Sequence, residues 1–151
     1  MIDDLDRIMA VMQDAFDPHW GEAWNRRQVE SSLVTPTTHY RLLDATGETP
    51  AEGVDAAAFA MVRAAPGEEE LLLIAVHPDL RGRGLAGRLI ERLSEDARAR
   101  GAERLFLEMR ENNPAETVYR RYGFEPIGRR PKYYTDGNGD KIDAITFAKS
   151  L

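Results

Sequence analysis

An apolar run followed by a turn rich in glycine and arginine constrains the fold more strongly than any other stretch of the chain. Residues 71–76 read Leu-Leu-Leu-Ile-Ala-Val, and Pro78 follows closely. Because the run is short and does not alternate, it predicts a strand that is covered on both faces. Apolar residues then recur at helical spacing from Leu85 until Gly101, which predicts a helix that ends at this glycine.

The turn between this strand and helix has the chemistry of an anion site, because the first N–H groups of a helix are unpaired and glycine lets a phosphate approach them. Gly82, Gly84 and Gly87 match the G-x-G-x-x-G of a dinucleotide site, and Glu108 follows at a suitable distance. However, residues 77–81 separate the strand from the turn, whereas a dinucleotide turn joins its strand almost at once. More strands also precede this unit than a first βαβ unit allows. A dinucleotide site is therefore the less favoured interpretation.

The composition limits the class of protein. The chain has 151 residues, and we expect residues 1–151 to form one domain. It contains no cysteine, which excludes disulfides and thiolate sites, and its three histidines lack metal-ligand spacing, so we expect no metal. A net charge of −6 disfavours nucleic acid as a partner. The N-terminus is acidic and no apolar run approaches about 20 residues, so we expect a cytoplasmic protein without membrane contact.

The remaining elements give a mixed α/β layout with helices on both faces of a sheet. Helices are predicted from Asp3 or Asp6 to Phe16 and from about Glu22 to Leu33, and Asn112-Asn113-Pro114 opens another. The strand around residues 105–109 should lie parallel to the central strand, because a helix of crossover length joins the two. The other predicted strands are His39–Leu43, Val54–Val62 and a terminal hairpin of Ile127–Tyr134 and Ile142–Ala148.

Two motifs carry a resemblance to a known family. Arg81-x-x-Gly84-x-Ala86, directly after the strand, resembles the coenzyme A pyrophosphate loop of the GCN5-related N-acetyltransferase (GNAT) superfamily. Asn112-x-x-Ala115-x-x-x-Tyr119-x-x-x-Gly123-Phe124 is similar to the GNAT segment that closes the cofactor site. The resemblance covers nearly the whole chain. It implies the GNAT fold, a mixed and mostly antiparallel central sheet with helices on both faces and a splayed parallel strand pair.

A narrower resemblance concerns the acceptor. Leu107–Arg110, Arg129–Tyr134 and Asp143-Ala144 are similar to the ribosomal-protein-alanine N-acetyltransferases, the RimI group of this superfamily. This implies direct transfer of acetyl from acetyl-CoA to the N-terminal α-amine of a protein, in the type case a ribosomal protein. We expect a monomer or weak homodimer. The alternatives are a small-molecule amine or a lysine side chain as acceptor, or a coenzyme A-binding module without catalysis.

The resemblance also assigns roles to residues. It makes Glu108 the base that takes the proton of the amine, although a strand glutamate could simply face solvent or pair with Arg110. It makes Tyr119 the acid that protonates the leaving thiolate, although a tyrosine at this spacing could be a core residue. Backbone N–H groups where the central strand bulges could stabilise the oxyanion. The expected acetyl-CoA contacts are Ile74, Ala75 and Val76 on the strand, and Arg81, Gly82, Arg83, Gly84, Leu85, Ala86 and Gly87 in the loop.

The chain departs from the family pattern in three places. One residue is deleted after Glu108, so that either Asn112 or Asn113 could face the cofactor. Gly82 and Gly87 stand where family members often carry arginine, which thins the expected phosphate contacts. The short strand that usually precedes the first helix is absent or too brief to see. For the acceptor, the exposed aromatic residues Trp20, Tyr133 and Tyr134 are the candidates.

Overall fold

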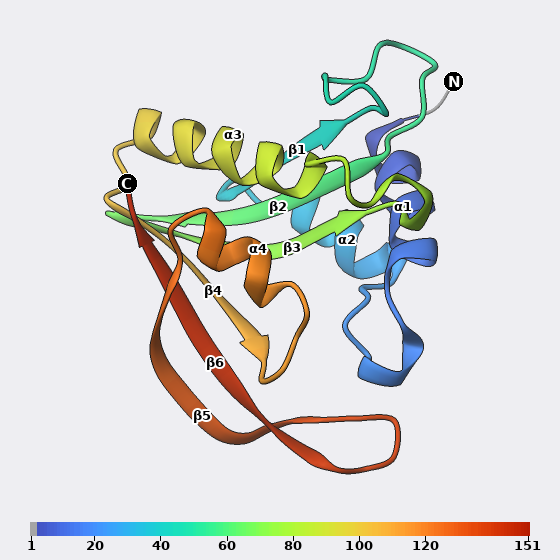
Figure 1. Cartoon of the computed structure of the whole chain (residues 1–151). Helices are drawn as coiled ribbons and strands as arrows, with labels where there is room; N and C mark the ends of the chain where they lie inside the picture. Colours follow the sequence, from blue (N-terminus) through green and yellow to red (C-terminus); the bar gives the residue numbers. More distant parts are fainter. Residues whose placement is uncertain (1–2) are drawn as a thin grey trace.

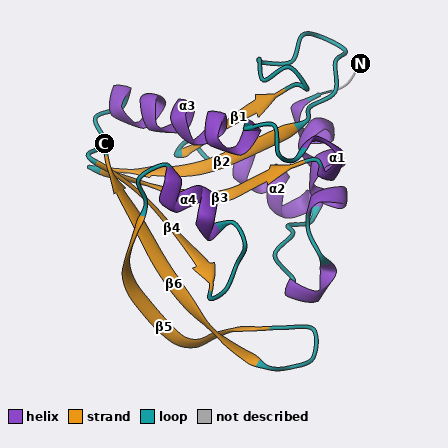
Figure 2. Ribbon diagram, in the orientation of Figure 1, coloured by secondary structure: helices purple, strands orange, loops and turns teal. Residues whose placement is uncertain are grey.

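The computed structural model describes residues 3–151 and consists of one six-stranded sheet with helices on both faces (Figures 1 and 2). The strand order is β1-β2-β3-β4-β6-β5. The strands are β1 Thr38–Leu43, β2 Ala58–Ala65, β3 Glu68–Val76, β4 Arg104–Arg110, β5 Glu125–Thr135 and β6 Lys141–Ser150. The helices are α1 Asp4–Ala15, α2 Arg26–Leu33, α3 Leu85–Ala99 and α4 Glu116–Arg121, with 3₁₀ turns η1 Pro18–Trp20 and η2 Pro78–Leu80.

The sheet is antiparallel at every neighbouring pair except β3 and β4. These two strands are parallel and pair only between residues 68–70 and residues 104–106. Beyond this point β3 continues to Val76 and β4 to Arg110 without pairing to each other, and Figure 1 shows the two strands diverging. The predicted fold class, with its splayed parallel pair, is confirmed.

Helices cover both faces of the sheet because β3 buries side chains on both. Leu73 and Ala75 pack in the cluster that also holds Ile8 and Met12 of α1. Leu71 packs in the second cluster, with Leu89, Ile90 and Leu93 of α3. In Figure 1, α1 and α2 lie behind the sheet, and α3 and α4 lie in front of it. No helix within residues 3–151 is long and apolar enough to cross a membrane.

The predicted start of the second helix at Glu22 is wrong. Helix α2 begins only at Arg26, because Asn25 and Gln28 form a capping box in which each side chain accepts a hydrogen bond from the backbone N–H of the other. The chain between η1 and α2 therefore remains a loop. Glu22 belongs to this loop and is directed toward the end of β4 instead of lying on a helix surface.

Two strands, β2 and β3, differ from the prediction by three residues or more at a boundary. Strand β2 runs over Ala58–Ala65 instead of Val54–Val62, because the carbonyl of Val54 accepts a hydrogen bond from the Arg7 guanidinium at 2.9 Å and lies outside the sheet. Strand β3 starts at Glu68, before the apolar run. Glu69 is 1% exposed, and its carboxylate accepts two hydrogen bonds from the Arg100 guanidinium, at 2.7 and 2.8 Å. Such a paired carboxylate can be buried within a strand.

Candidate active site

The gap between β3 and β4 exposes main-chain groups of β3. Opposite residues of an antiparallel pair alternate between those that exchange hydrogen bonds and those that do not. The N–H of His77 donates to the carbonyl of Ala57 on the β2 side at 2.8 Å, and Ala75 lies opposite Phe59. The peptide groups of Ala75 therefore face β2, while those of Ile74 and Val76 face the gap. Of the three expected oxyanion donors, the geometry favours these two.

The bulge of β3 lies before these residues. Met61 is opposite Leu73, but the next residue of β2, Val62, is opposite Leu71, so that Leu72 has no partner on β2. A bulge increases the local twist and turns the strand that carries it. It occurs just beyond the last residue of β3 that pairs with β4, Glu70. The bulge and the separation of the two strands therefore coincide.

The turn before α3 supplies unpaired amides. Gly82 and Gly84 have φ angles of 79° and 80°, in the left-handed region that favours glycine, and Gly84 caps α3 without a side-chain hydrogen bond. The first helical hydrogen bond is donated by Arg88 to the carbonyl of Gly84. The N–H groups of residues 85–87 thus have no partner within the helix. A Cβ at Gly82 or Gly84 would meet nothing within 4 Å, so there is open space for an anion.

The two arginines of the turn differ in their contacts. The Arg81 guanidinium donates a hydrogen bond at 2.6 Å to the carbonyl of Ala15, the last residue of α1. It therefore satisfies one of the terminal carbonyls of that helix. Arg83 is exposed. Contacts to a diphosphate would come chiefly from the main-chain amides of the turn, with Arg83 as the available side chain.

Glu108 lies on β4, opposite Thr146 of β6, and its side chain is 16% exposed. Its Oε2 is 2.9 Å from the Nε of Arg130, and it accepts a hydrogen bond from the Thr146 hydroxyl at 3.3 Å. The expected alternative partner, Arg110, instead lies 3.8 Å from Glu22. Glu108 is thus partly buried and held by residues of β5 and β6, as a base must be oriented.

Tyr119 lies on α4 and is 7% exposed. Its ring packs edge-on against Phe124, with 5.6 Å between the ring centroids. Burial raises the pKa of the Tyr119 phenol, and the negative charge of Glu22 raises it further. The phenol is therefore protonated at neutral pH, the state that a general acid needs. The packing also makes it a core residue, and its role as the acid stays a prediction.

Two residues near these side chains were not predicted. Glu22 and Arg110 face each other, with 3.8 Å between Oε1 and Nε, and the Arg110 guanidinium carbon lies 3.7 Å from the centroid of the Trp20 ring. Burial raises the pKa of Glu22, although the charge of Arg110 opposes this effect. The capping box at Asn25 is the sequence signal that could have placed Glu22 in a loop. Trp20, an expected acceptor contact, is thus the stacking partner of an arginine.

Residues of the β5–β6 hairpin also lie near Glu22 and Glu108. Tyr134 is half-buried, and its pKa is raised to about 12, first by burial and then by the charge of Glu108. Tyr133 is 52% exposed and lies under the Arg130 guanidinium, at 5.0 Å from the ring centroid. Of the two tyrosines, Tyr134 is therefore the one near the candidate base.

The two asparagines have different environments. Asn112 is exposed and has a φ angle of 65°. Asn113 is half-buried; its side chain accepts a hydrogen bond from the N–H of Ala115 at 2.9 Å and donates one to Glu22 at 3.4 Å. The geometry therefore favours Asn113 as the residue that faces the site. Because its side chain holds Ala115, helix α4 starts only at Glu116, later than the predicted opening.

Comparison with known proteins identifies the family of this chain. The profile of the acetyltransferase (GNAT) family matches residues 5–124. The chain belongs to this family. Its members are acetyl-CoA-dependent N-acetyltransferases.

Three proteins illustrate the likeness of this GNAT chain. A ribosomal protein bS18-alanine N-acetyltransferase of Salmonella typhimurium is 39% identical over 93 residues, which are 61% of this chain and 62% of that protein. The alignment thus spans about three fifths of the relative. The crystal structure of the ribosomal-protein-S18-alanine N-acetyltransferase from Escherichia coli has a TM-score of 0.77 and 28% identity, over 99% of this chain and 90% of that one. An aminoglycoside 6'-N-acetyltransferase complexed with coenzyme A has a TM-score of 0.75 over 97% of this chain and 89% of that one. With 15% identity, it shows a shared fold alone.

Gly87 of this GNAT chain has a packing role. It is buried in the first turn of α3, and a Cβ at this position would overlap with the ring and hydroxyl of Tyr122, which follows α4. Its backbone N–H can still belong to the unpaired group at the helix start. The absence of a side chain is therefore explained by the close approach of the α4 segment, without any contribution of a ligand.

We expect the substitution Gly87→Ala to lower the free energy of unfolding by about 1–3 kcal/mol, because the added methyl overpacks a buried contact. Denaturant unfolding measures the change. Gly128→Ala is a matched control, since a Cβ there has only an ordinary contact with Thr146, at 3.9 Å. The double variant Gly87→Ala/Tyr122→Ala should show favourable coupling between the two sites. A Gly87→Ala protein as stable as the wild type would show that Tyr122 does not pack against this residue.

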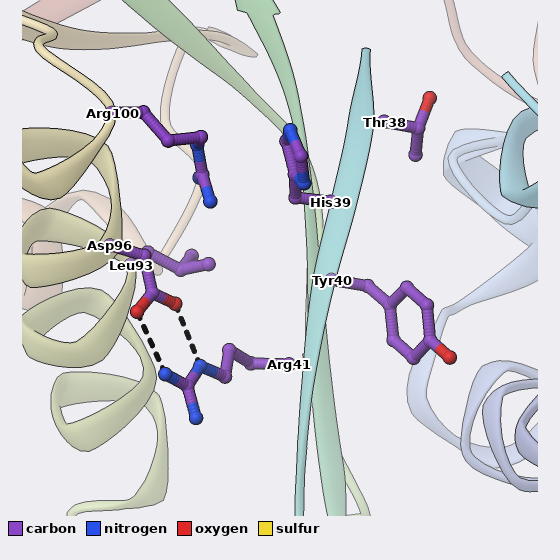
Figure 3. A pocket seen from close by; sticks show the side chains of 7 residues that line it. All are labelled: Thr38, His39, Tyr40, Arg41, Leu93, Asp96 and Arg100. Carbon is purple, nitrogen blue, oxygen red and sulfur yellow. Dashed lines mark hydrogen bonds and ion pairs between the residues drawn. The ribbon is translucent and has the colours of Figure 1, made fainter. Parts of the chain in front are cut away.

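A cavity of about 370 Å³ lies between β1 and α3, away from the gap between β3 and β4. It is lined by residues of β1 and α3, namely Thr38, His39, Tyr40, Arg41, Leu93, Asp96 and Arg100 (Figure 3). Arg41 donates two hydrogen bonds to Asp96, both at 2.7 Å, which connect the edge strand to the helix. Arg41 is paired with Asp96 and Arg100 with Glu69, so we interpret this cavity as a structural feature.

This ion pair predicts a pH-dependent stability. The hydrogen bond from Arg41 holds the pKa of Asp96 below its usual value, so the pair stabilises the fold above the pKa of an unfolded aspartate and loses this effect as the pH falls through the folded pKa. Asp96→Asn should therefore lower the free energy of unfolding by about 1 kcal/mol at neutral pH, since the pair is partly exposed. Denaturant unfolding in acid should show no difference, and Glu95→Gln serves as the exposed control. A difference that persists in acid would contradict this origin.

Proposed function

We propose that this protein transfers the acetyl group of acetyl-CoA to the N-terminal α-amine of a protein that begins with alanine, with a ribosomal protein as a suitable acceptor. The observation that carries the proposal is the partly buried Glu108 on the splayed β4, close to the hairpin and to Tyr134. The likeness of the chain to ribosomal-protein-alanine N-acetyltransferases supports the choice of acceptor.

The residues of the turn fit the anionic end of acetyl-CoA. The amides of residues 85–87 and the open space at Gly82 and Gly84 suit a diphosphate. The peptide groups of Ile74 and Val76 face the gap, where the amide-containing arm could pair with β3 as an added strand would. When bound, acetyl-CoA supplies an acetyl group activated as a thioester.

Residues of the chain would accept and donate the protons of the reaction. An α-ammonium has no lone pair, so it must lose a proton before its nitrogen can attack. Glu108 takes this proton, directly or through water, while Arg130 and Thr146 keep the carboxylate in place. Tyr119 donates its phenolic proton to the thiolate that leaves. The N–H groups of Ile74 or Val76 donate hydrogen bonds to the carbonyl oxygen that gains charge.

A panel of acceptors tests this function. The purified protein is incubated with acetyl-CoA and either a peptide that begins with alanine, the same peptide with a blocked N-terminus, a polyamine or an aminoglycoside, and the release of free thiol is followed. We expect rapid release with the first peptide and a rate at the background level with the blocked one. Rapid release with only the small amines would contradict the proposed acceptor and leave the family assignment intact.

A further inference from the structure

The carboxylate of Glu22 is directed toward the candidate site. It comes from the loop after η1, and three elements face its carboxylate: β4 through Arg110, the segment before α4 through Asn113, and α4 through Tyr119. The residue is half-buried, with 29% of its side chain exposed. A loop carboxylate that could point to solvent is thus directed inward, next to the candidate acid.

The polar contacts of Glu22 are long. Arg110 Nε is 3.8 Å from its Oε1, beyond hydrogen-bond distance, and Asn113 Nδ2 is 3.4 Å from its Oε2. In the same structure, Glu108 has a contact of 2.9 Å with Arg130. Within residues 3–151, the buried Nε of Arg110 has no hydrogen-bond partner. The charged groups around Glu22 therefore lie close to one another but leave hydrogen-bonding capacity unused. Buried polar groups usually have hydrogen-bond partners.

Tyr134 connects the two carboxylates. Its pKa is raised by burial first, then by the charge of Glu108, and also by the charge of Glu22. The Tyr134 side chain is thus within electrostatic range of both glutamates. Glu108 and Arg110 lie two residues apart on β4, so their side chains are on the same face of the sheet, and the Glu22 carboxylate lies 3.8 Å from Arg110.

We infer that Glu22 is an acceptor-binding residue, which forms with Glu108 a two-carboxylate site for the α-ammonium group of the acceptor. The inference rests on the proposed function. Glu22 binds the ammonium as a charge-assisted partner, and Glu108 then takes the proton. Glu108 passes the first ammonium proton to solvent, and the free amine then forms the C–N bond. The nitrogen gives Glu108 a second proton as the C–S bond breaks, the thiolate receives the proton of Tyr119, and Glu108 releases its proton to solvent. Proton transfer from solvent restores the phenol.

The ionisation of Glu22 predicts a pH dependence. Its carboxylate is faced by Arg110 on β4, Tyr119 on α4 and Tyr134 on β5, and by Asp17 in its own loop. Burial raises the pKa of Glu22 in spite of Arg110. Because only the ionised form binds an ammonium group, acceptor binding should weaken as the pH falls through this raised pKa, at a higher pH than for an ordinary glutamate.

The test is steady-state kinetics of Glu22→Gln with acetyl-CoA and the peptide that begins with alanine. We expect KM for the peptide to rise by about 10- to 100-fold, as for the loss of one charge-assisted contact. KM for acetyl-CoA should stay within about twofold, and the acid limb of the kcat/KM profile should lose one ionisation. Glu30→Gln, a matched change on the exposed surface of α2, should leave all three unchanged.

Glu22→Asp keeps the charge opposite Arg110 and guards against a folding defect, and its KM for the peptide should lie between those of the wild type and Glu22→Gln. An unchanged KM for the peptide in Glu22→Gln, or a fall in kcat alone with the wild-type pH profile, would overturn the inference. In either case the wild type still acetylates the peptide, so the proposed function stands while the inference about Glu22 fails. If the wild type itself fails to acetylate it, the proposed function fails, and the inference with it.

Discussion

Replacing Glu108 by glutamine is expected to lower kcat by about 10²–10⁴-fold, the usual contribution of a positioned general base. The amide keeps the shape of the side chain and can still accept the hydrogen bond from Thr146, but it cannot take the amine proton. Stopped assays with the alanine-starting peptide at saturating acetyl-CoA measure the effect. The variant should lose less at high pH, where more of the amine is already deprotonated.

The control for this variant concerns Arg130. Glu108→Gln also breaks the ion pair with Arg130, whose side chain is 61% exposed. If the loss arose from the broken ion pair, Arg130→Gln would reproduce it. We expect Arg130→Gln to keep kcat within about 10-fold, because an exposed ion pair contributes little energy. A Glu108→Gln enzyme that retains half of the wild-type kcat would show that this carboxylate is not the base.

The substitution Tyr119→Phe is expected to lower kcat by about 10²–10³-fold, because the thiolate would have to leave without a proton donor. KM for the peptide should change little, since the ring and its contact with Phe124 are preserved. The free energy of unfolding should remain within about 1 kcal/mol, as only a hydroxyl is removed. Parallel kinetics and denaturant unfolding separate the two effects.

Tyr122→Phe provides the comparison for Tyr119→Phe. It removes the same hydroxyl from a neighbouring tyrosine of the same segment, and it should leave kcat near the wild-type value. Equal losses in the two variants would indicate a general disturbance of the α4 segment. A Tyr119→Phe enzyme with unchanged kcat would assign this residue to the core alone.

The central unit of the fold could be predicted because its signals are local. Pro78, the glycines at 82 and 84 and the helical spacing after Leu85 are all read within a few residues. The parallel pairing of β3 and β4 follows from the length of the connection between them. The terminal hairpin has equally local signals in its turn. These parts needed no knowledge of distant contacts.

The errors arose where distant contacts decide the structure. The end of the loop before β2 is fixed by the hydrogen bond from Arg7 to Val54, two residues far apart in the sequence. Glu69 looked unsuited to a buried strand, and only its pairing with Arg100 makes burial possible. The contacts of Glu22 with β4 likewise depend on how the loop packs, and no pattern in the sequence predicts them.

The candidate site likewise combines residues that belong to sequence motifs with contacts between distant residues. The resemblance to the GNAT superfamily proposes Glu108 as the base and Tyr119 as the acid. It could not identify Arg130 as the partner of Glu108, because that contact joins β4 to β5 across β6. It also left Asn112 and Asn113 undecided, and only the left-handed backbone of Asn112 and the inward side chain of Asn113 favour the latter.

The most direct test of the account is mass spectrometry of one peptide that offers both kinds of amine. The peptide begins with alanine, carries a lysine further along, and is incubated with acetyl-CoA and the wild-type protein. Fragmentation should locate a single acetyl group on the α-amine of the alanine, and the Glu108→Gln variant should give almost none. Acetylation of the lysine alone, or no acetylation of either amine, would contradict the account.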